Sequence, residues 1–484
     1  MKSLIYFLII FISSTLYSQE TILSFQNLDI KKNIKNVENY SLSDEKTNNL
    51  AIILGQKDKI TGYLYNSNFE KIGEAAGISL KKKYSEIIGY SITNESIYTL
   101  VYSTDSGKNF EYSTINFETG KIVSNEIDFK LDDEFYLETI HYKNRMIMMS
   151  ATKNDLLILR EFTEDFTFEE MSPFRLDNPN EDHKLLTNQF SFNAFDPFKT
   201  TIYGITKIDN NVPNTISHTS NKSKLYQKDD NIYITVEDEK SKRTILKILN
   251  LSDLKLITKT LKYPEGKKEN FKNFNSFIYG QYFFHIASSR DEMIFQVKSF
   301  DNLIIKEFYV AKESTIEFKN SPIFQRGSTY SYGSGKKNLN TTKQFLRKIT
   351  SSNLGISVYQ ENNNYQITFG SSEVIFNSGR LSNFQSRGTT FNTPGGSVFV
   401  PSYSPTFSSF NSYGRSKDVF TNGLFDNTFN HIEGEVLENN IFDRIKEFQD
   451  ELKWDTAEDV FIHNGTTYFS YWNTREQTYF LLQF

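Results

Sequence analysis

Histidines are few enough in this 484-residue chain for their spacing to be tested for chemistry. No two of the six lie within five positions of one another, which excludes H-x-H and H-E-x-x-H metal motifs. His141 and His463 hold matching places, each before the turn that leads to the second strand of a repeated unit described below. A site shared between them could form at one face of the fold, although two turn histidines in solvent is the simpler interpretation. The six are His141, His183, His218, His285, His431 and His463.

Cysteine is absent, and this removes several classes of chemistry. The chain can form no disulfide framework, thiolate zinc site, iron–sulfur cluster or Cys nucleophile. It also lacks an EF-hand loop and a G-x-S-x-G elbow, and Gly333–Lys337 fails as a phosphate loop because Tyr330 stands where glycine is needed. We therefore expect no cofactor and no metal site, and we assign no catalytic residue.

Carboxylates leave an enzymatic alternative open. A glycoside hydrolase needs two carboxyl groups about 5–10 Å apart. With 59 Asp and Glu spread along the chain, spacing alone selects no pair. Trp454 and Trp472 could serve as platforms for sugar rings, although we expect Trp472 to lie in the core.

Aromatic side chains are frequent in one segment of unusual composition. Residues 374–417 contain no acidic residue, three of the nine prolines and many Ser, Asn, Thr and Gly. We expect 371–430 to form an insertion, a long loop that contacts a protein partner, a glycan or the outer membrane. The alternatives are a strand pair lying on the main fold or a solvated linker. The expected contact residues are Phe399, Tyr403, Phe407, Tyr413 and Arg415.

The N-terminus predicts export. Lys2 precedes nine unbroken apolar residues, Leu4 to Ile12, and small polar residues follow, so we expect a signal peptide over 1–18. An uncleaved anchor helix is the alternative. No later run reaches 18 apolar residues, so we expect no transmembrane span after signal removal. The YSQE ending and the overall composition resemble exported proteins of AT-rich Bacteroidetes-type bacteria. The net charge of −5 gives no reason to expect a nucleic-acid partner.

A repeated unit of strand, polar turn and strand organises the rest of the chain. Copies start at positions 50, 97, 146, 232, 282 and 467, at intervals of 47, 49, 86, 50 and 185 residues. Each of the last five copies is preceded by one more short strand and a tight polar turn, so the complete unit has four strands. The interval of 86 is close to twice 43, so a degenerate unit could lie near 199–209. Another candidate starts at Leu354.

These repeats resemble β-propeller blades, because a four-stranded meander recurring every 43–50 residues can bury both faces only against its neighbours. The resemblance implies an all-β fold of about seven blades, with a range of six to eight, built from 19–370 and 431–484. No WD40, kelch or sialidase signature is present. We expect Asn440–Leu452 to form an amphipathic helix that docks on the propeller.

A strand before the first repeat predicts how the ring closes. The last copy ends at Phe484 after three strands, and Thr21 to Ile30 has strand character. We expect it to pair with the last blade, which would remove two exposed edges. The alternative is a loose N-terminal arm.

Together these features favour an exported, non-enzymatic binding or scaffolding protein of the cell envelope, in the periplasm or on the cell surface. Its partner would be an envelope protein or a glycan. The alternatives are a polysaccharide-active hydrolase or lyase on a propeller scaffold, and a chain in which 320–453 folds separately.

Overall fold

The architecture is that of a computed structural model, which describes most of the chain after the N-terminal segment. The described residues are 19–32, 37–56, 59–78, 84, 86–104, 108–152, 156–175, 191–192, 202–203, 205–268, 270–326, 337–361, 363–374, 389–393, 396–400, 404–412, 416–436 and 440–484. The expected signal peptide over 1–18 lies outside them.

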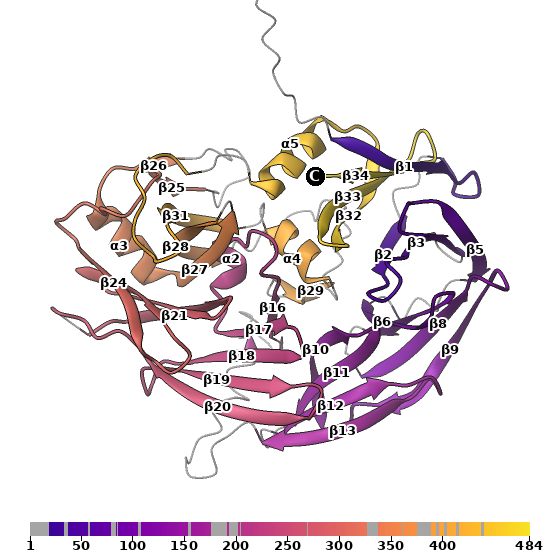
Figure 1. The fold of residues 1–484 in the computed structure, drawn as a ribbon, viewed down its shortest axis with the longest axis horizontal. Coiled ribbons are helices and arrows are strands. Elements are labelled where there is room, and N and C mark those ends of the chain that lie inside the picture. Colours follow the sequence, from indigo (N-terminus) through magenta and orange to yellow (C-terminus); the bar gives the residue numbers. More distant parts are fainter. Residues whose placement is uncertain are drawn as a thin grey trace, which may run out of the picture.

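Seven blades are arranged around a central axis, which confirms the predicted β-propeller (Figure 1). Each blade is a mostly antiparallel sheet with one strand nearest the axis. The blades succeed one another in chain order. The first two join into one eight-stranded sheet, because their outermost strands pair in parallel at Ala76 and Lys121.

The first three blades follow the predicted meander without interruption. Their second strands begin at Leu50, Ile97 and Arg145, within one residue of the repeat starts. The strands are β2 (Glu38–Ser43), β3 (Leu50–Gln56), β4 (Lys59–Tyr65) and β5 (Lys71–Ile78), then β6 (Glu86–Asn94), β7 (Ile97–Ser103), β8 (Asn109–Asn116) and β9 (Lys121–Lys130), then β10 (Glu134–Tyr142), β11 (Arg145–Thr152), β12 (Leu156–Phe162) and β13 (Phe168–Arg175).

The fourth and fifth blades repeat this order, and the fourth has an additional inner strand. Strand β16 (Thr206–Ile208) pairs in parallel with β17, so the degenerate unit expected near 199–209 is not a blade. A separate pair, β14 (Ser191–Phe192) and β15 (Ile202–Tyr203), precedes it. The meander strands are β17 (Ser223–Lys228), β18 (Asn231–Asp238), β19 (Arg243–Asn250) and β20 (Lys255–Lys262), then β21 (Asn273–Tyr279), β22 (Tyr282–Ser288), β23 (Glu292–Lys298) and β24 (Ile304–Ala311).

The sixth blade is assembled out of chain order. Its inner strands are β27 (Asn353–Glu361) and β28 (Asn364–Val374), and β31 (Ser416–Phe425) pairs along β28. The outer strands β25 (Ile323–Gln325) and β26 (Lys337–Leu339) come earlier in the chain. The expected insertion over 371–430 is therefore too wide, since 371–374 belong to β28 and 416–425 form β31. The region 320–453 supplies all five strands of this blade, so it belongs to the propeller.

The N-terminal strand closes the ring. β1 (Glu20–Gln26) pairs antiparallel with β34 (Thr478–Gln483) and is the outermost strand of the last blade. The other strands of this blade are β33 (Thr466–Asn473) and β32 (Asp455–His463). The ring of Phe25 packs 4.3 Å from Tyr63 and 5.0 Å from Tyr479, centroid to centroid. β1 thus covers an edge of the last blade and contacts the first.

Helices fill the space between the sixth and seventh blades (Figure 1). α2 (Ile216–Thr219) contacts β27 and β28, whereas α4 (Pro405–Asn411) contacts β32. The predicted amphipathic helix is α5 (Ile441–Glu451), capped by Asn440, whose side chain accepts two backbone N–H groups. Phe442 and Ile445 of α5 and Phe410 of α4 pack on the last blade in one cluster. A fourth helix of the described residues, α3 (Thr342–Ser351), covers the sixth blade.

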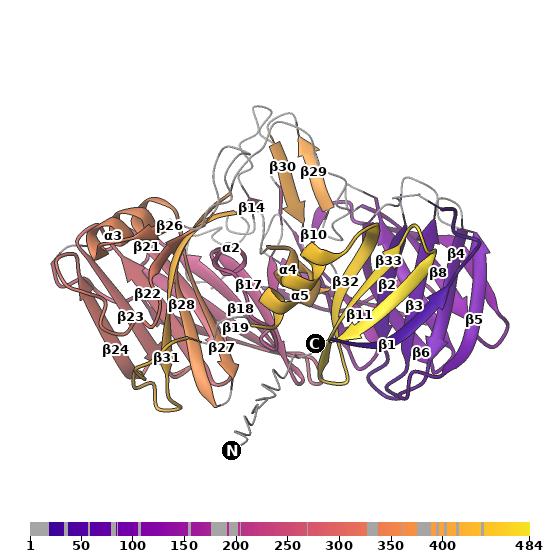
Figure 2. The same cartoon turned by 90° about the horizontal axis from the view of Figure 1, so that it is seen from above.

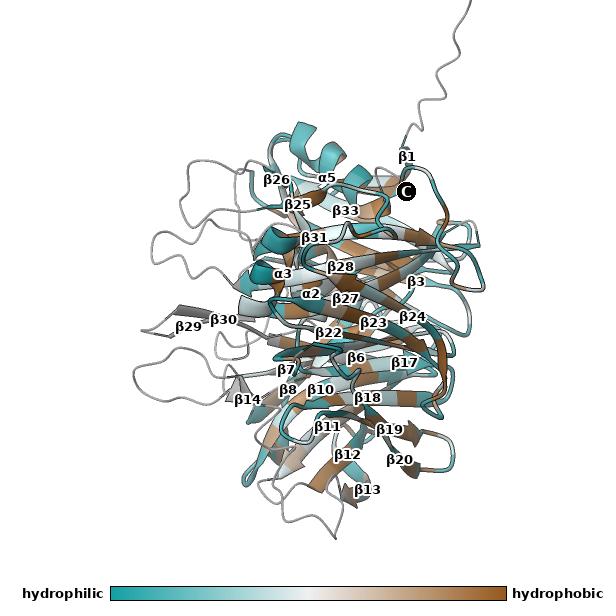
Figure 3. Cartoon of the chain, turned by 90° about the vertical axis from the view of Figure 1, so that its left-hand side faces the viewer, coloured by the Kyte–Doolittle hydropathy of each residue, from teal (hydrophilic) through white to brown (hydrophobic). Residues whose placement is uncertain are grey.

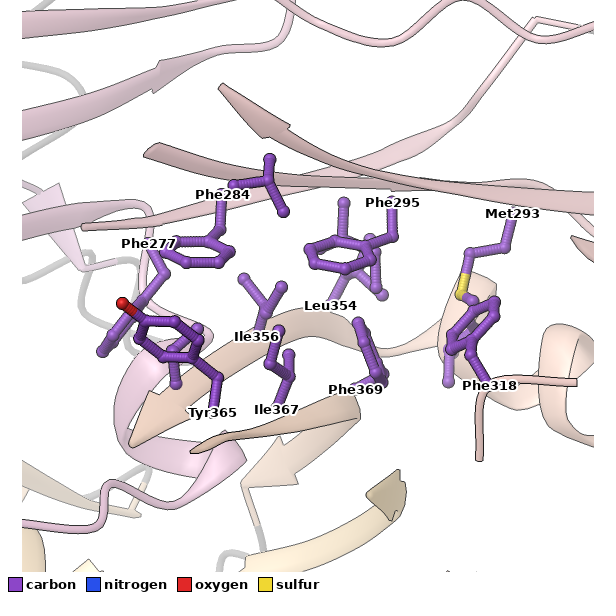
Figure 4. Packing of buried hydrophobic residues seen from close by; sticks show 14 of the residues in the cluster. Phe277, Phe284, Met293, Phe295, Phe318, Leu354, Ile356, Tyr365, Ile367 and Phe369 are labelled. Atoms are coloured by element: carbon purple, nitrogen blue, oxygen red, sulfur yellow. The ribbon is translucent and has the colours of Figure 1, made fainter. Parts of the chain in front are cut away.

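The hydrophobic core is divided among the spaces between neighbouring blades. The largest cluster joins the fifth and sixth blades, where Phe295 lies 4.8 Å from Phe369 and edge-on to it (Figure 4). Because both faces of each inner strand are covered, MIMM in β11 is fully buried, as its continuous apolar run predicts. A disulfide-free chain takes its stability from this packing.

Candidate functional site

The ends of the inner strands bring His141 and His463 to the same side of the propeller. His463 Nδ1 lies 2.8 Å from Ser43 Oγ, and the Ser43 carbonyl accepts a 3.3 Å hydrogen bond from the Tyr90 hydroxyl. The ring of Tyr90 stacks on that of His141 at 4.2 Å. This chain of contacts crosses the seventh, first, second and third blades. Both histidines are packed in protein, so the expectation of two turn histidines in solvent is wrong.

A two-residue turn fixes this end of the third blade to the first. Lys143 and Asn144, between β10 and β11, both have positive φ (52° and 65°), as in a type I′ turn. The Asn144 side-chain amide donates to Asp44 at 2.7 Å, and its oxygen accepts from the Glu45 backbone N–H at 3.0 Å. The turn therefore ties two blades that are not neighbours.

Nearer the axis lie three ionisable residues, which we call the axial cluster: Glu138 and Lys207, which are buried, and His141, which is half-buried with buried ring nitrogens. Glu138 is 1% exposed and Lys207 is 6% exposed. Lys207 comes from β16, and its ammonium donates to the Thr139 carbonyl of β10 at 3.1 Å. Glu138 accepts from the Thr139 backbone N–H at 2.9 Å. Strand β16 is thus held to the third blade through a charged side chain.

Burial controls the protonation of the axial cluster. It raises the pKa of Glu138 above the usual glutamate range, against the opposing attraction of Lys207. It lowers the pKa of Lys207, although Glu138 favours the ammonium. It lowers the pKa of His141 to about 3, and the charge of Lys207 acts in the same direction. His141 is therefore neutral at pH 7, and its two buried ring nitrogens lack a well-formed hydrogen bond among the described residues.

The chemistry open to the axial cluster is proton transfer between a carboxyl group, an imidazole and an amine. Glu138 and Lys207 are covered by protein, so a substrate could reach them only if the surrounding elements moved. Within the described ranges, no three His, Asp or Glu side chains are grouped as a metal site.

A second buried polar network joins the fourth and fifth blades. Glu237 accepts from the hydroxyls of Ser276 at 2.5 Å, Thr244 at 2.7 Å and Tyr263 at 2.8 Å. Lys224, fully buried, donates to Asn275 at 3.2 Å, and burial lowers its pKa to about 8. Each of these buried polar groups has a hydrogen-bond partner, and a buried network with all its groups paired stabilises a core.

Of the five residues expected to contact a partner, the structure describes the side chain of Phe407 alone. Phe399 belongs to β30 (Gly396–Val400), of which the structure describes the backbone alone, and Tyr403, Tyr413 and Arg415 lie outside the described residues. Phe407 is 3% exposed and packs in the helix cluster of α4 and α5, so it belongs to the core. Composition misled here, because a Ser- and Pro-rich segment still contributes a capped helix with two buried phenylalanines.

The rest of that segment includes a hairpin. β29 (Thr389–Thr393) and β30 form a two-stranded sheet of their own, which stands away from the blades in Figure 2. A strand pair is thus present, as one alternative expected, but it stands away from the main fold, whereas that alternative placed it on the fold. Of the two tryptophans, Trp472 is fully buried, as expected, and Trp454 is 57% exposed.

No signal in the sequence identifies the axial cluster. Glu138 and His141 are three positions apart on one strand, and Lys207 lies in a three-residue strand 66 positions later. Their proximity depends on the position of β16 against the third blade, which no local pattern predicts.

Comparison with known proteins gives no family. No protein-family model and no curated protein matches the chain. Among solved structures, a DUF4221 family member from Bacteroides vulgatus ATCC 8482 is 11% identical with a TM-score of 0.31, covering 93% of this chain and 98% of that one. The Nup133 β-propeller domain of Vanderwaltozyma polyspora is also 11% identical with a TM-score of 0.31, covering 93% and 97%. At these values the likenesses do not bear on function, and the fold assignment rests on the strand order.

In the part of the chain that the structure describes, no helix combines the length and the apolar character needed to cross a bilayer.

Proposed function

We propose that this chain is an exported, non-enzymatic binding or scaffolding protein of the cell envelope. Its partner, an envelope protein or a glycan, would meet the face from which the β29–β30 hairpin extends. The observation that carries the proposal is that this hairpin forms a sheet separate from every blade. A two-stranded sheet alone is marginally stable, so a partner that covers it would stabilise it.

The arrangement around the axis supports binding over catalysis. Inner strands, β16, α2 and α4 contact one another there. The acidic and basic side chains between them are buried and hydrogen-bonded to the fold, as Lys207 and Glu138 are. Buried charged side chains that hydrogen-bond to the backbone of a neighbouring blade stabilise the contact between the blades.

Export is supported by the N-terminal sequence, with Lys2 before the apolar run of Leu4 to Ile12, and it sets where the partner is sought. Fractionation of native cells with an antibody to the chain tests it. We expect the protein outside the cytoplasm, with its mature N-terminus near residue 19. Recovery of the full-length chain in the cytoplasm would contradict the proposal.

Replacing 389–400 by a Gly-Ser linker of equal length tests the role of the hairpin. In chemical cross-linking on intact cells, we expect the wild-type chain to give a discrete adduct and the replacement variant to lose it at equal protein level. A Gly-Ser replacement of the exposed turn at 239–242 is the control. The same adduct from the hairpin variant would show that the partner binds elsewhere.

The axial cluster favours an enzyme as the second candidate, because its carboxyl group has a raised pKa. Release of reducing ends from a panel of polysaccharides, by the wild type and by Glu138→Gln, tests this candidate. Activity in the wild type that is lost in the folded variant would replace the binding proposal.

A further inference from the structure

Charge is distributed unevenly between the two sides of the propeller. Residues 38–175, which form the first three blades, contain 15 basic and 23 acidic residues, a net charge of −8. Residues 205–374, which contain the fourth and fifth blades and part of the sixth, have 25 basic and 17 acidic residues, a net charge of +8. A slightly acidic protein thus has one strongly basic side.

Helix α3 covers the sixth blade, on this basic side. It carries Lys343, Arg347 and Lys348 and no acidic residue. Lys343 and Arg347 are exposed and one turn apart, a like-charge spacing that costs a few tenths of a kcal/mol. Figure 3 shows the helix as a hydrophilic element on the side from which the hairpin extends.

Loops of the fifth blade extend the positive charge beyond the helix. Lys268, Lys312 and Lys343 all act on the carboxyl group of Asp291 and help to lower its pKa, the largest effect being its hydrogen bond with Lys312. One carboxylate therefore faces three cations. Lys268 is exposed, and its own ammonium makes no ion pair among the described residues.

The other end of α3 faces further cations. Burial lowers the pKa of Lys348, and Lys417 and Arg347 lower it further, against the weaker opposing effect of Glu373. Glu373 is itself paired with Lys417 at 2.8 Å. Within the described ranges, no carboxylate lies within 4 Å of the side-chain nitrogens of Lys343, Arg347 or Lys348. The exposed face of α3 thus keeps a positive charge that the fold leaves uncompensated.

We propose that this surface, formed by Lys268, Lys343, Arg347 and Lys348, binds an acidic polysaccharide. A row of lysine and arginine side chains attracts a polymer with regularly spaced carboxylates, and bound carboxylates relieve the repulsion within the row. The choice of a polysaccharide as the ligand rests on the proposed envelope location. The presence of the basic surface does not depend on that location.

A lipid bilayer fits this surface less well. Interfacial binding combines basic residues with exposed apolar or aromatic side chains that enter the headgroup region. The large hydrophobic side chains that the described residues expose lie elsewhere, on β5, β9, β20, β24, the β23–β24 turn and near residues 28 and 454. The surface around α3 is therefore polar as well as basic.

Binding of polygalacturonate, a polymer of carboxylated sugars, to the full chain tests the proposal. We expect saturable binding that weakens from 50 to 200 mM salt. The triple variant Lys343→Gln, Arg347→Gln, Lys348→Gln should lose about tenfold in affinity, from three exposed ion pairs. The matched control is Lys59→Gln, Lys121→Gln, Lys130→Gln, three exposed lysines of the first two blades, and it should bind as the wild type does.

The other outcomes distinguish the possible occupants. Equal binding by the triple variant and the wild type would overturn the proposal, as would binding of neutral dextran with the same affinity. Binding to phosphatidylglycerol vesicles without binding to the polymer would assign the surface to a membrane and overturn it. Salt-sensitive dimerisation lost in the triple variant, without polymer binding, would assign it to the acidic side of a second copy. The hairpin replacement should leave polymer binding unchanged, so failure of the proposed function stays distinguishable.

Discussion

At the residue scale, Asn144 joins two blades through a single side chain. Its amide satisfies the buried carboxylate of Asp44, and its φ of 65° suits asparagine or glycine. We predict that Asn144→Ala destabilises the protein by about 2–3 kcal/mol, from unsatisfied partners and backbone strain. The measurement is the free energy of unfolding in urea.

Asn144→Gly separates the two causes, because glycine accepts the backbone conformation but lacks the amide. It should recover part of the loss. If both variants unfold as the wild type does, the contact with Asp44 contributes nothing.

A second residue-scale prediction concerns pH. Burial lowers the pKa of His218 to about 4 from 6.5, and its Nε2 lies 3.1 Å from the Lys207 carbonyl. Below pH 6.5 the unfolded chain therefore binds a proton that the folded chain does not, and stability falls as the pH falls through 6.5 toward 4. From pH 6.5 to 5 this residue alone accounts for about 2 kcal/mol.

His218→Gln removes that titration. We predict that the slope of unfolding free energy against pH, between pH 5 and 6.5, decreases by about one proton. Glu138, whose pKa is raised in the folded chain, contributes to this slope with the opposite sign. Its contribution is the same in the wild type and the variant, because both contain it. An unchanged slope would mean that His218 titrates alike in the folded and unfolded chain.

At the scale of elements, the segment between β28 and β31 has two parts with different roles. We predict that replacing 389–400 by a linker changes the melting temperature little, since long loops are tolerated. Phe407→Ala should cost about 3 kcal/mol, because it leaves a cavity between α4 and the last blade. Thermal unfolding by circular dichroism measures both.

This pair of variants corrects an expectation from composition. A long loop over the whole of 374–417 would tolerate deletion at little cost in stability, but this deletion would also remove α4 and the first residues of β31. A large loss from the hairpin replacement, with none from Phe407→Ala, would reverse the assignment.

The elements also show what a sequence can predict. The repeat starts fall within one residue of the second strands of six blades, because those strands are buried on both faces and read as apolar runs between polar turns. The sixth blade was less visible, since 41 residues separate β28 from β31 and β25 precedes β27. No sequence pattern indicates the axial cluster. Lys207 lies on β16, which is only three residues long, whereas Glu138 and His141 lie on β10.

At the scale of the whole molecule, the pairing of β1 with β34 closes the ring of blades. Half-buried side chains of β1, such as Leu23 and Phe25, pack between the last and first blades. We predict that removing 19–26 lowers the unfolding free energy by about 3–5 kcal/mol. Phe25→Ala should lower the unfolding free energy by part of that amount, and urea titration measures both variants. If the truncated chain unfolds as the wild type does, β1 is dispensable for stability.

Closure is tested most directly by cross-linking the two ends, which a chain without cysteine allows cleanly. Glu20 and Gln483 are exposed partners in the β1–β34 register, so their Cα atoms lie within disulfide range. We predict that Glu20→Cys, Gln483→Cys forms an intramolecular disulfide under mild oxidation. Gln26→Cys, Gln483→Cys should not, because Gln26 pairs with Thr478, about 17 Å along the strand from position 483. Equal cross-linking of the two variants, or none in either, would contradict a propeller closed by its N-terminal strand.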